Sequence, residues 1–416
     1  MKLLHFADLH LGIENYGALN PRTGLSTRVD DFLKALDAVI DAAIAENVDA
    51  VLFAGDAFKN RDPSPTLQRM FAQRIRRLAQ AEIPTVLLTG NHDLPSIAAR
   101  ATAIDIYEAL EIPNIYPARE ITLLTLKTTS GPLQVLTVPW IPRNMVTATE
   151  AFRGLSADEQ LVKFGEVIAQ SVSRRVDTLD PDVPAVLLGH LSLEGAKLGS
   201  EQSIMLGAEV VLTPTELSLD AFTYVALGHI HRHQRLGARP PVVYAGSVER
   251  VDFGEARESK GFVLVDIARS SEDGWNARWS FKTLPTRPFV TLEIEPTSDD
   301  PMEEIRKLID RRQMDIEGAI VRMTVKVPAE REDQIRVDEI RRWLQAAGAA
   351  WIARVTRDVD SQSRPRVDIR EEEALIPETM LERWLAMRDI PESRRERVRA
   401  AGIELIRADR AASSKE

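Results

Sequence analysis

The sequence predicts an α/β protein: a two-sheet sandwich flanked by helices, with a small α/β cap domain and C-terminal helices. Three observations predict this class. Short apolar runs suited to buried strands alternate with helical stretches in the first part of the chain, strand-like segments dominate beyond about residue 120, and strand and helix patterns resume after a proline-rich boundary. Alternation of strands and helices is typical of layered α/β domains.

Length and composition indicate an ordinary globular protein. With 416 residues, the chain is expected to form two or three domains, and its 44% hydrophobic and 28% charged residues provide ample core and surface. No apolar run is long enough to span a bilayer, so we expect no membrane segment. The N-terminal stretch Met1–Asp8 is too short in apolar residues for a signal peptide and is expected to be the first strand.

The absence of cysteine limits the possible chemistry. Disulfides, zinc–thiolate sites and cysteine nucleophiles are excluded, and the composition is compatible with a cytoplasmic protein. Any metal must be bound by His, Asp, Glu or Asn. The formal net charge of -10 argues weakly against a protein coated by nucleic acid. It does not exclude a nuclease, because metal ions or a partner subunit can supply positive charge.

The first domain is predicted to cover residues 1–284. Helical periodicity predicts three helices, at Thr27–Glu46, Thr66–Ala81 and Ser96–Leu110. Later apolar segments predict strands at Leu133–Val138, Val242–Ala245 and Phe262–Ile267. Together with the early strands, they predict a sandwich of two sheets.

Pro285 and Pro288 mark a domain boundary. The cap domain is predicted at residues 285–357, a linker at 358–373 and a helical partner-binding segment at 374–416. Within the cap domain, the patterns predict strands at Phe289–Glu295, Ala319–Val327 and Trp351–Thr356, and helices at Met302–Arg312 and Asp333–Ala347.

Two amphipathic helices are predicted after the linker. The first carries an apolar face with Met380, Leu385 and Met387, and the second carries one with Val398 and Ile406. Two such helices cannot form a core of their own, so they either fold back on the body or bind a partner, and we favour the partner. The basic run Arg394–Arg399 between the two faces is most simply a solvated surface, with nucleic-acid contact as the alternative.

Five apolar runs end in polar residues of a narrow set. Because buried strands present functional groups at their carboxyl ends, we expect these residues to gather at one edge. They are Asp8, His10, Asp56, Asn91, His92, Asp93, His190, His229 and His231. A single histidine at a strand end is more often structural, but five of the seven histidines follow such runs. The remaining two, His5 and His233, are interpreted as structural or surface residues.

The residue types predict a metal centre. Asp8 and His10, like His229 and His231, are separated by two positions, so in an extended backbone each pair projects to one side. The mixture of imidazole, carboxylate and amide oxygen suits manganese, iron or zinc. The seven candidate ligands are too many for one ion, and two ions could share Asp56. They are Asp8, His10, Asp56, Asn91, His190, His229 and His231.

Two metals close together suit in-line displacement at phosphorus. Protonation of the leaving group then requires an acid outside the metal ligands, and His92 is the candidate. Asp93 is predicted to orient the imidazole of His92. On its own, Gly90–Asp93 could also be an ordinary polar turn, and the other four strand ends favour the site.

The succession of motifs is similar to the calcineurin-like metallophosphoesterase superfamily. The motifs are Asp8-x-His10, Gly55-Asp56, Gly90-Asn91-His92-Asp93, Gly189-His190 and Gly228-His229-x-His231. The resemblance implies a first metal bound by Asp8, His10, Asp56 and His231, and a second bound by Asp56, Asn91, His190 and His229. It also implies that His92 contacts the transition state and assists the leaving group.

Within this superfamily, the chain resembles the SbcD-type nucleases of double-strand-break repair. The stretches Leu4–Gly12 and Tyr244–Glu255 are similar to theirs, as are the cap domain and terminal helices. The resemblance implies a manganese-dependent DNA phosphodiesterase with 3'-to-5' exonuclease activity on duplex ends and endonuclease activity on single strands or hairpins. It further implies an SbcC-like coiled-coil ATPase on the C-terminal helices, and a homodimer formed through Thr66–Ala81 and Ser96–Leu110.

Two departures and two alternatives accompany this resemblance. Lys59 stands where SbcD-type relatives often have His or Asp, so a second histidine that helps position DNA is absent. Protein phosphatases of the superfamily typically have Gly-Asn-His-Glu, whereas Asp93 and the different context of Arg61 favour a diester substrate. The alternatives are an enzyme acting on cyclic nucleotides, nucleotide diesters or phosphoproteins, and a non-catalytic scaffold, which the complete ligand set disfavours.

Overall fold

The computed structural model describes residues 1–21, 23–95, 100–142, 152–199, 210–217, 219–271, 274–360, 377, 381–382, 385 and 392–413. These residues divide into two compact units. The first comprises 1–292 with 306–323 and 338–355, and the second comprises the rest of the described chain. The domain boundaries expected after residues 284 and 357 stay predictions.

Two six-stranded sheets lie in the first unit, which confirms the predicted sandwich. The first sheet has the order β14-β13-β1-β2-β3-β4, with β1 to β4 parallel. Its strands are β1 (Lys2–Phe6), β2 (Ala50–Phe53), β3 (Thr85–Leu88), β4 (Ile115–Ala118), β13 (Gly261–Ser270) and β14 (Gly274–Thr283).

The second sheet has the order β11-β12-β10-β7-β6-β5, with β12, β10, β7 and β6 parallel. Its strands are β5 (Thr122–Thr128), β6 (Gly131–Val138), β7 (Ala185–His190), β10 (Tyr224–Gly228), β11 (Gln234–Ala238) and β12 (Pro241–Tyr244). Beside it, β8 (Ser192–Leu193) pairs with β9 (Val211–Leu212).

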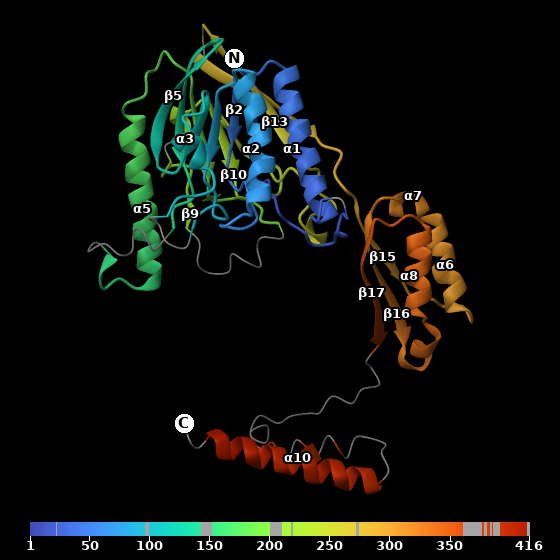
Figure 1. Cartoon of the computed structure of the whole chain (residues 1–416). Coiled ribbons are helices and arrows are strands. Elements are labelled where there is room, and N and C mark those ends of the chain that lie inside the picture. Colours follow the sequence, from blue (N-terminus) through green and yellow to red (C-terminus); the bar gives the residue numbers. More distant parts are fainter. Residues whose placement is uncertain are drawn as a thin grey trace. The chain divides into compact units, whose positions relative to one another are not determined.

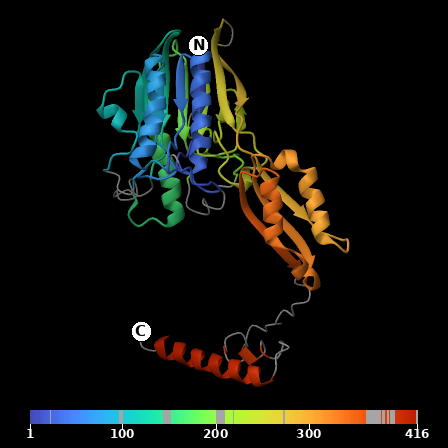
Figure 2. The same cartoon turned by 45° about the vertical axis from the view of Figure 1, so that its right-hand side comes forward.

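Three apolar cores hold the layers together. Helices α1 (Thr27–Ala45) and α2 (Pro65–Gln80) pack on the first sheet, and the inner faces of the two sheets pack on each other. Helix α5 (Ala157–Val176) covers the outer face of the second sheet through residues such as Phe164 and Ile168. Figures 1 and 2 show α1 and α2 side by side, and Figure 1 shows α5 on the opposite side of the sandwich.

Local capping explains where the predicted helices begin. The side chain of Ser26 accepts the backbone N–H of Arg28 at the start of α1. Ser64 does the same for Leu67, and Pro65 occupies the first position of α2. These are the residue types that helix N-termini favour. Both helices match their predicted ranges to within one residue.

The predicted helix Ser96–Leu110 is wrong in length. Among its described residues, only α3 (Ile106–Ala109) is helical. The Asp105 carboxylate accepts the backbone N–H of Thr102 at 2.7 Å and the Thr102 hydroxyl at 2.8 Å, and Arg119 donates to it at 2.6 Å. These local bonds compete with a helical backbone and favour a turn before α3.

The strands and helices expected in the cap domain are all present. Strands β15 (Phe289–Ile294), β16 (Ile320–Pro328) and β17 (Trp351–Asp360) form a sheet in that order. The helices are α6 (Pro301–Arg311), α7 (Gln313–Ile316) and α8 (Val337–Ala346). Of the two predicted C-terminal helices, the second corresponds to α10 (Glu392–Ser413), and most of the first lies outside the described residues. None of the described helices has the length and hydropathy needed to cross a membrane.

Candidate metal centre

The parallel strands bring the five predicted motifs to one edge of the sandwich. Strands β1, β2 and β3 of the first sheet lead into Asp8, Asp56 and Asn91, and β7 and β10 of the second sheet lead to His190 and His229. Parallel strands place their carboxyl ends at the same edge. The convergence predicted from the sequence is therefore a consequence of the fold.

The backbone at this edge is not extended, contrary to the expectation for the two paired motifs. Asp8, His10, Asp56 and His229 have φ values of 52°, 47°, 60° and 93°. Positive φ is uncommon for residues with a side chain, and it costs on the order of 1–3 kcal/mol at functional sites. The side chains of each paired motif converge because the backbone turns sharply at Asp8, His10 and His229. An extended backbone is not the cause.

Glycines before the candidate ligands leave no room for a side chain. A Cβ on Gly90 would lie 2.1 Å from Oδ1 of Asp56, and one on Gly228 would lie 2.1 Å from the carbonyl oxygen of Ala54. The close approach of the loops from neighbouring strands therefore requires glycine at both positions.

Asp56 lies between two groups of candidate ligands. Its Oδ2 is 3.6 Å from Nε2 of His10 and 3.4 Å from Nε2 of His190. On the first side, Nε2 of His10 and Nε2 of His231 are 2.9 Å apart, and a ligand atom of Asp8 lies within 4.8 Å of both histidines. This geometry allows one carboxylate to serve two ions.

Asn91 joins the histidines of the second group. Its Oδ1 lies 2.9 Å from Nε2 of His190 and 3.2 Å from Nδ1 of His229. The backbone carbonyl of Ala54 accepts from Nδ1 of His190 at 2.7 Å, which leaves Nε2 of that ring to face Asn91 and Asp56. All seven predicted ligands therefore lie at this centre.

The residues present fit divalent ions. Oδ2 of Asp8 is buried and has no hydrogen-bond partner among the described residues, whereas its Oδ1 accepts the backbone N–H of His229 at 2.9 Å. Burial holds the pKa of His10 well below its usual range, so the imidazole is neutral and can donate a lone pair. Carboxylate, amide and imidazole donors together suit a divalent transition metal.

His92 lies beside His10 and Asp56. Its ring packs edge-on against His10, with ring centroids 4.7 Å apart, and its backbone N–H donates to Oδ1 of Asp56 at 2.9 Å. Its Nδ1–H donates to the carbonyl oxygen of Lys59 at 2.9 Å. Because a carbonyl can only accept, this contact leaves Nε2 of His92 available to a substrate.

Contrary to the prediction, Asp93 does not orient His92, because its carboxylate binds backbone N–H groups of two loops. Its buried carboxylate accepts four backbone N–H groups, those of Asp56 and Gly90 at 3.0 Å and those of Ala57 and Phe58 at 3.2 Å. Burial, with Asp56 nearby, raises the pKa of Asp93 to about 7, whereas the four N–H groups favour its ionised form. Asp93 joins the loops after β2 and β3, and the carbonyl of Lys59 orients His92.

Two residues of the centre were not singled out from the sequence. The Glu255 carboxylate accepts from Nδ1 of His231 at 2.7 Å, and Trp140 packs on His229 with ring centroids 4.9 Å apart. Glu255 is the last residue of the stretch Tyr244–Glu255, which carries part of the family resemblance, so this stretch could have pointed to it. Trp140 follows β6 as an isolated aromatic residue and offered no comparable pattern.

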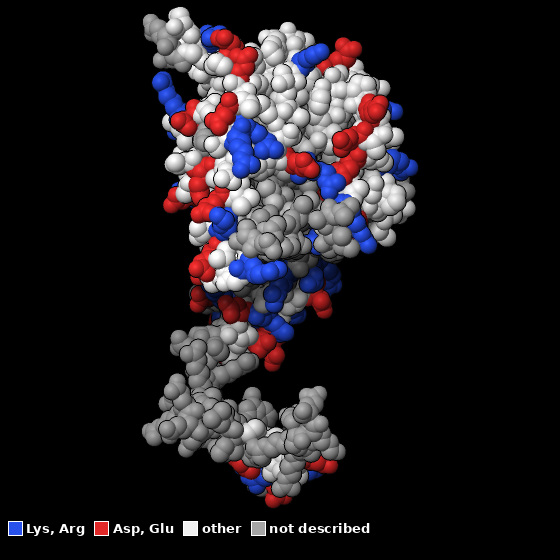
Figure 3. Space-filling view, turned by 90° about the vertical axis from the view of Figure 1, so that its left-hand side faces the viewer, with Lys and Arg blue, Asp and Glu red and all other residues white. Residues whose placement is uncertain are grey.

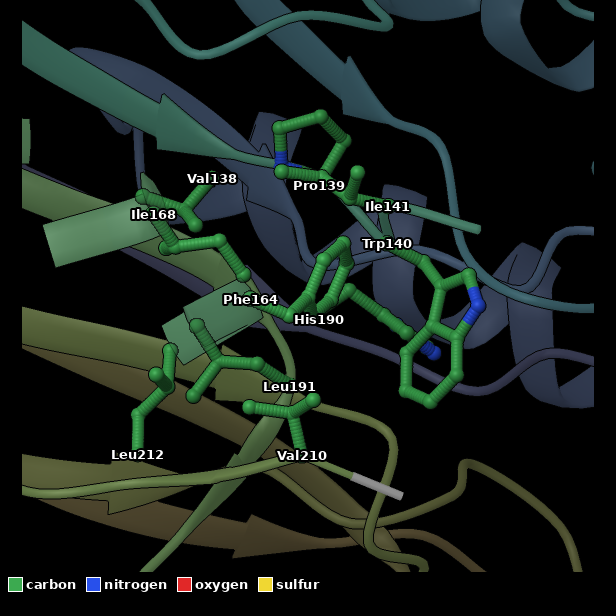
Figure 4. A pocket seen from close by; sticks show the side chains of 10 residues that line it. All are labelled: Val138, Pro139, Trp140, Ile141, Phe164, Ile168, His190, Leu191, Val210 and Leu212. Atoms are coloured by element: carbon green, nitrogen blue, oxygen red, sulfur yellow. The ribbon is translucent and has the colours of Figure 1, made fainter. Parts of the chain in front are cut away.

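An apolar cavity of about 60 Å³ adjoins the second group of ligands. Figure 4 shows the rings of His190 and Trp140 on one side of it. Its other lining residues are mainly aliphatic or aromatic and include Val138, Phe164, Leu191 and Leu212. The centre is thus bordered on this side by an apolar wall.

The two remaining histidines have structural contacts, in agreement with the prediction. Nδ1 of His5 lies 3.0 Å from the hydroxyl of Tyr224 inside the sandwich, and burial lowers the pKa of His5 to about 3. His233 stacks on Phe281 with centroids 3.9 Å apart.

A sandwich with two adjoining ligand groups at its strand ends defines a metal-dependent phosphoesterase. The model of the calcineurin-like phosphoesterase family matches residues 1–233, more than half of the chain. The chain belongs to this family.

Curated relatives are similar over most of the chain. The SbcD component of the nuclease SbcCD from Bacillus subtilis is 26% identical over 378 residues, which cover 89% of each protein. The same component from Escherichia coli K12 is 26% identical and covers 74% of this chain and 81% of the relative. The DNA double-strand break repair protein Mre11 of Haloferax volcanii is also 26% identical and covers 99% of this chain and 79% of that protein.

Proposed function

We propose that this chain is a two-metal DNA phosphodiesterase, the nuclease component of an ATP-dependent DNA repair complex of the SbcCD type, acting in the cytoplasm. The position of Asp56 supports this most strongly. Its Oδ2 lies within 3.6 Å of a histidine from each ligand group, as expected of a carboxylate that bridges two ions.

Each ion has its own set of ligands in this proposal. Asp8, His10, Asp56 and His231 bind the first ion, and Asp56, Asn91, His190 and His229 bind the second. Both ions are manganese, which the mixed nitrogen and oxygen donors suit. When bound, the pair of ions activates a water and neutralises charge on the phosphate.

The remaining roles belong to residues of the chain itself. Nε2 of His92 points away from its Lys59 contact. With the ring as an imidazolium, Nε2–H donates its proton to the leaving oxygen of the scissile phosphodiester, and the ring that results is neutral with its proton on Nδ1. Asp93 accepts backbone N–H groups from the loops after β2 and β3, and thereby holds Asp56 and His92 at their relative positions.

DNA is the proposed substrate. The relatives named above are nucleases and a double-strand break repair protein. The net charge is -10, and basic and acidic side chains are interspersed over the face presented in Figure 3. Part of the positive charge that DNA binding needs is therefore assigned to the bound ions and to a partner subunit.

The activity assigned is 3'-to-5' exonuclease cleavage of duplex ends and endonuclease cleavage of single strands and hairpins. End-labelled duplex, hairpin and single-stranded DNA, incubated with Mn²⁺ and then with chelator, test it. We expect metal-dependent shortening of the duplex and cutting of the hairpin. Intact DNA with a folded, manganese-loaded protein would refute the proposal, as would much faster hydrolysis of a small chromogenic diester.

Two protein partners complete the proposal. An SbcC-like coiled-coil ATPase binds the C-terminal helices, of which α10 carries Leu405 with 72% of its surface exposed. A second copy of the chain packs through α2 and the region of α3, where Ile106 and Leu110 are 50% and 62% exposed. Light scattering on the isolated chain tests the dimer.

A further inference from the structure

His231 is held at three points by the segment of residues 246–260. Nδ1 of His231 donates to Oε1 of Glu255 at 2.7 Å. The backbone carbonyl of His231 accepts from Nζ of Lys260 at 2.9 Å and from the backbone N–H of Ser247 at 3.0 Å. Both the side chain and the backbone of His231 are therefore fixed by residues that follow it in the chain.

Glu255 and Lys260 form a buried ion pair behind this histidine. Nζ of Lys260 lies 2.9 Å from Oε2 of Glu255, and both side chains are fully buried. Nζ of Lys260 also donates to the Glu258 carboxylate and to the His231 carbonyl, so each of its three ammonium protons has an acceptor. Oε2 of Glu255 also accepts the backbone N–H of Val251 at 2.9 Å. A buried pair persists when its hydrogen bonds are satisfied in this way.

The direction of the first contact decides which nitrogen of His231 faces the centre. A carboxylate accepts, so the proton of the neutral ring resides on Nδ1 and the lone pair on Nε2. Nε2 lies 2.9 Å from Nε2 of His10, inside the first ligand group. We infer that Glu255 is a positioning residue: paired with Lys260, it aims Nε2 of His231 at the first ion and sets the affinity of that ion.

The second ligand group has a different support. His190 is oriented by the neutral carbonyl of Ala54. A carboxylate raises the basicity of a ligating imidazole more than a neutral oxygen does. Glu255 therefore strengthens the binding of the first ion through His231. This inference rests on the two-metal centre proposed above.

Manganese binding to three variants tests the inference. Free Mn²⁺ is followed by electron paramagnetic resonance while the full-length chain is titrated, with thermal unfolding measured in parallel. Glu255→Ala should weaken one of the two sites about 10- to 100-fold and change the other by less than about threefold. Glu255→Gln, which keeps the side-chain volume, should weaken the same site by less.

Glu249→Gln is the matched control. Glu249 is a buried carboxylate of the same segment, and its contacts are Arg28 and the backbone N–H groups of Arg250 and Arg287. This variant should bind both ions as the unmodified chain does. An equal loss of manganese in Glu249→Gln and Glu255→Ala would overturn the inference, as would equal weakening of both sites in Glu255→Ala.

Nitrogen-15 NMR of the histidine rings gives a readout that does not depend on activity. In the metal-free chain, His231 should show the tautomer with the proton on Nδ1, and Glu255→Gln should shift the ring towards the other tautomer. An unchanged tautomer together with unchanged manganese binding would refute the positioning role. If Glu255→Ala does not fold, Glu255→Gln decides the question alone. A chain that binds two ions as described but leaves DNA intact would contradict the proposed function and leave the inference standing.

Discussion

The Asp93 carboxylate accepts the backbone N–H of Asp56 at 3.0 Å, which ties the proposed bridging residue to the loop after β3. Asp93→Asn should destabilise the fold by about 1–3 kcal/mol, because an amide nitrogen would replace one of the two oxygens that face four N–H groups. It should also weaken manganese binding. Chemical denaturation and manganese titration measure the two effects. Asp182→Asn, at a side chain that is 75% exposed, should change neither.

His92 and Asp56 should separate catalysis from metal binding. His92→Ala removes the proposed proton donor but none of the seven ligands, so it should retain two ions and lose about 10²- to 10⁴-fold in cleavage rate. Asp56→Asn should lose both metal and activity, because it weakens the shared ligand. Metal analysis and cleavage of end-labelled DNA measure this pair. The control is His233→Gln. The ring of His233 stacks on Phe281, and this variant should remain active. Full cleavage by His92→Ala would contradict its role.

Lys59 contributes to His92 through its backbone. Because the carbonyl oxygen of residue 59 accepts from Nδ1 of His92, replacing the side chain should leave this orientation intact. Lys59→Ala and Lys59→His should therefore cut DNA with kcat within about threefold of the unmodified chain, with any effect confined to KM. Steady-state kinetics on a labelled hairpin measure both constants. A large fall in kcat would show that the ammonium group takes part in the chemistry.

The ease of prediction differed among these residues for physical reasons. The strand ends and the ligands were predictable because parallel strands leave a strong pattern, apolar runs followed by polar residues, and because the glycines before Asp56 and Asn91 are visible in the sequence. The positive φ values of Asp8 and His10 were not, since they arise from backbone hydrogen bonds to Gly55 and Asp56 in a loop distant in the chain.

Contacts between loops were the main source of error. Asp93 stands next to His92, and adjacency suggested that the carboxylate holds the imidazole. Instead it turns towards the loop after β2, whose N–H groups have no signature in the sequence. The turn before α3 was missed for a similar reason, because the Asp105 carboxylate binds the backbone N–H and the hydroxyl of Thr102 inside a stretch with helical periodicity. The role of Glu255 could not be predicted from the sequence, because it depends on the contact with His231 that the fold creates.

The glycine before Asn91 provides a test of how closely the loops must approach. Gly90→Ala would place a Cβ 2.1 Å from Oδ1 of Asp56, and so should displace that carboxylate and abolish binding of at least one ion. Gly165→Ala is the matched control: its nearest contact would be at an ordinary 3.5 Å, and its position within α5 favours alanine by roughly 1 kcal/mol. Manganese titration of both variants, with thermal unfolding, distinguishes them. Normal metal binding by Gly90→Ala would show that the loops can move apart.

The C-terminal segment should bind the coiled-coil ATPase independently of the metal centre. A chain ending at residue 373 should lose co-purification with an SbcC-like ATPase and keep its basal manganese-dependent nuclease activity, because no proposed ligand lies beyond His231. Leu405→Asp is a milder variant that places a charge on the exposed apolar side chain of α10, and it should weaken the complex at least tenfold. Val162→Asp, at a side chain of α5 that is 65% exposed, should leave the complex intact. Unchanged association of the shortened chain would place the ATPase on another surface.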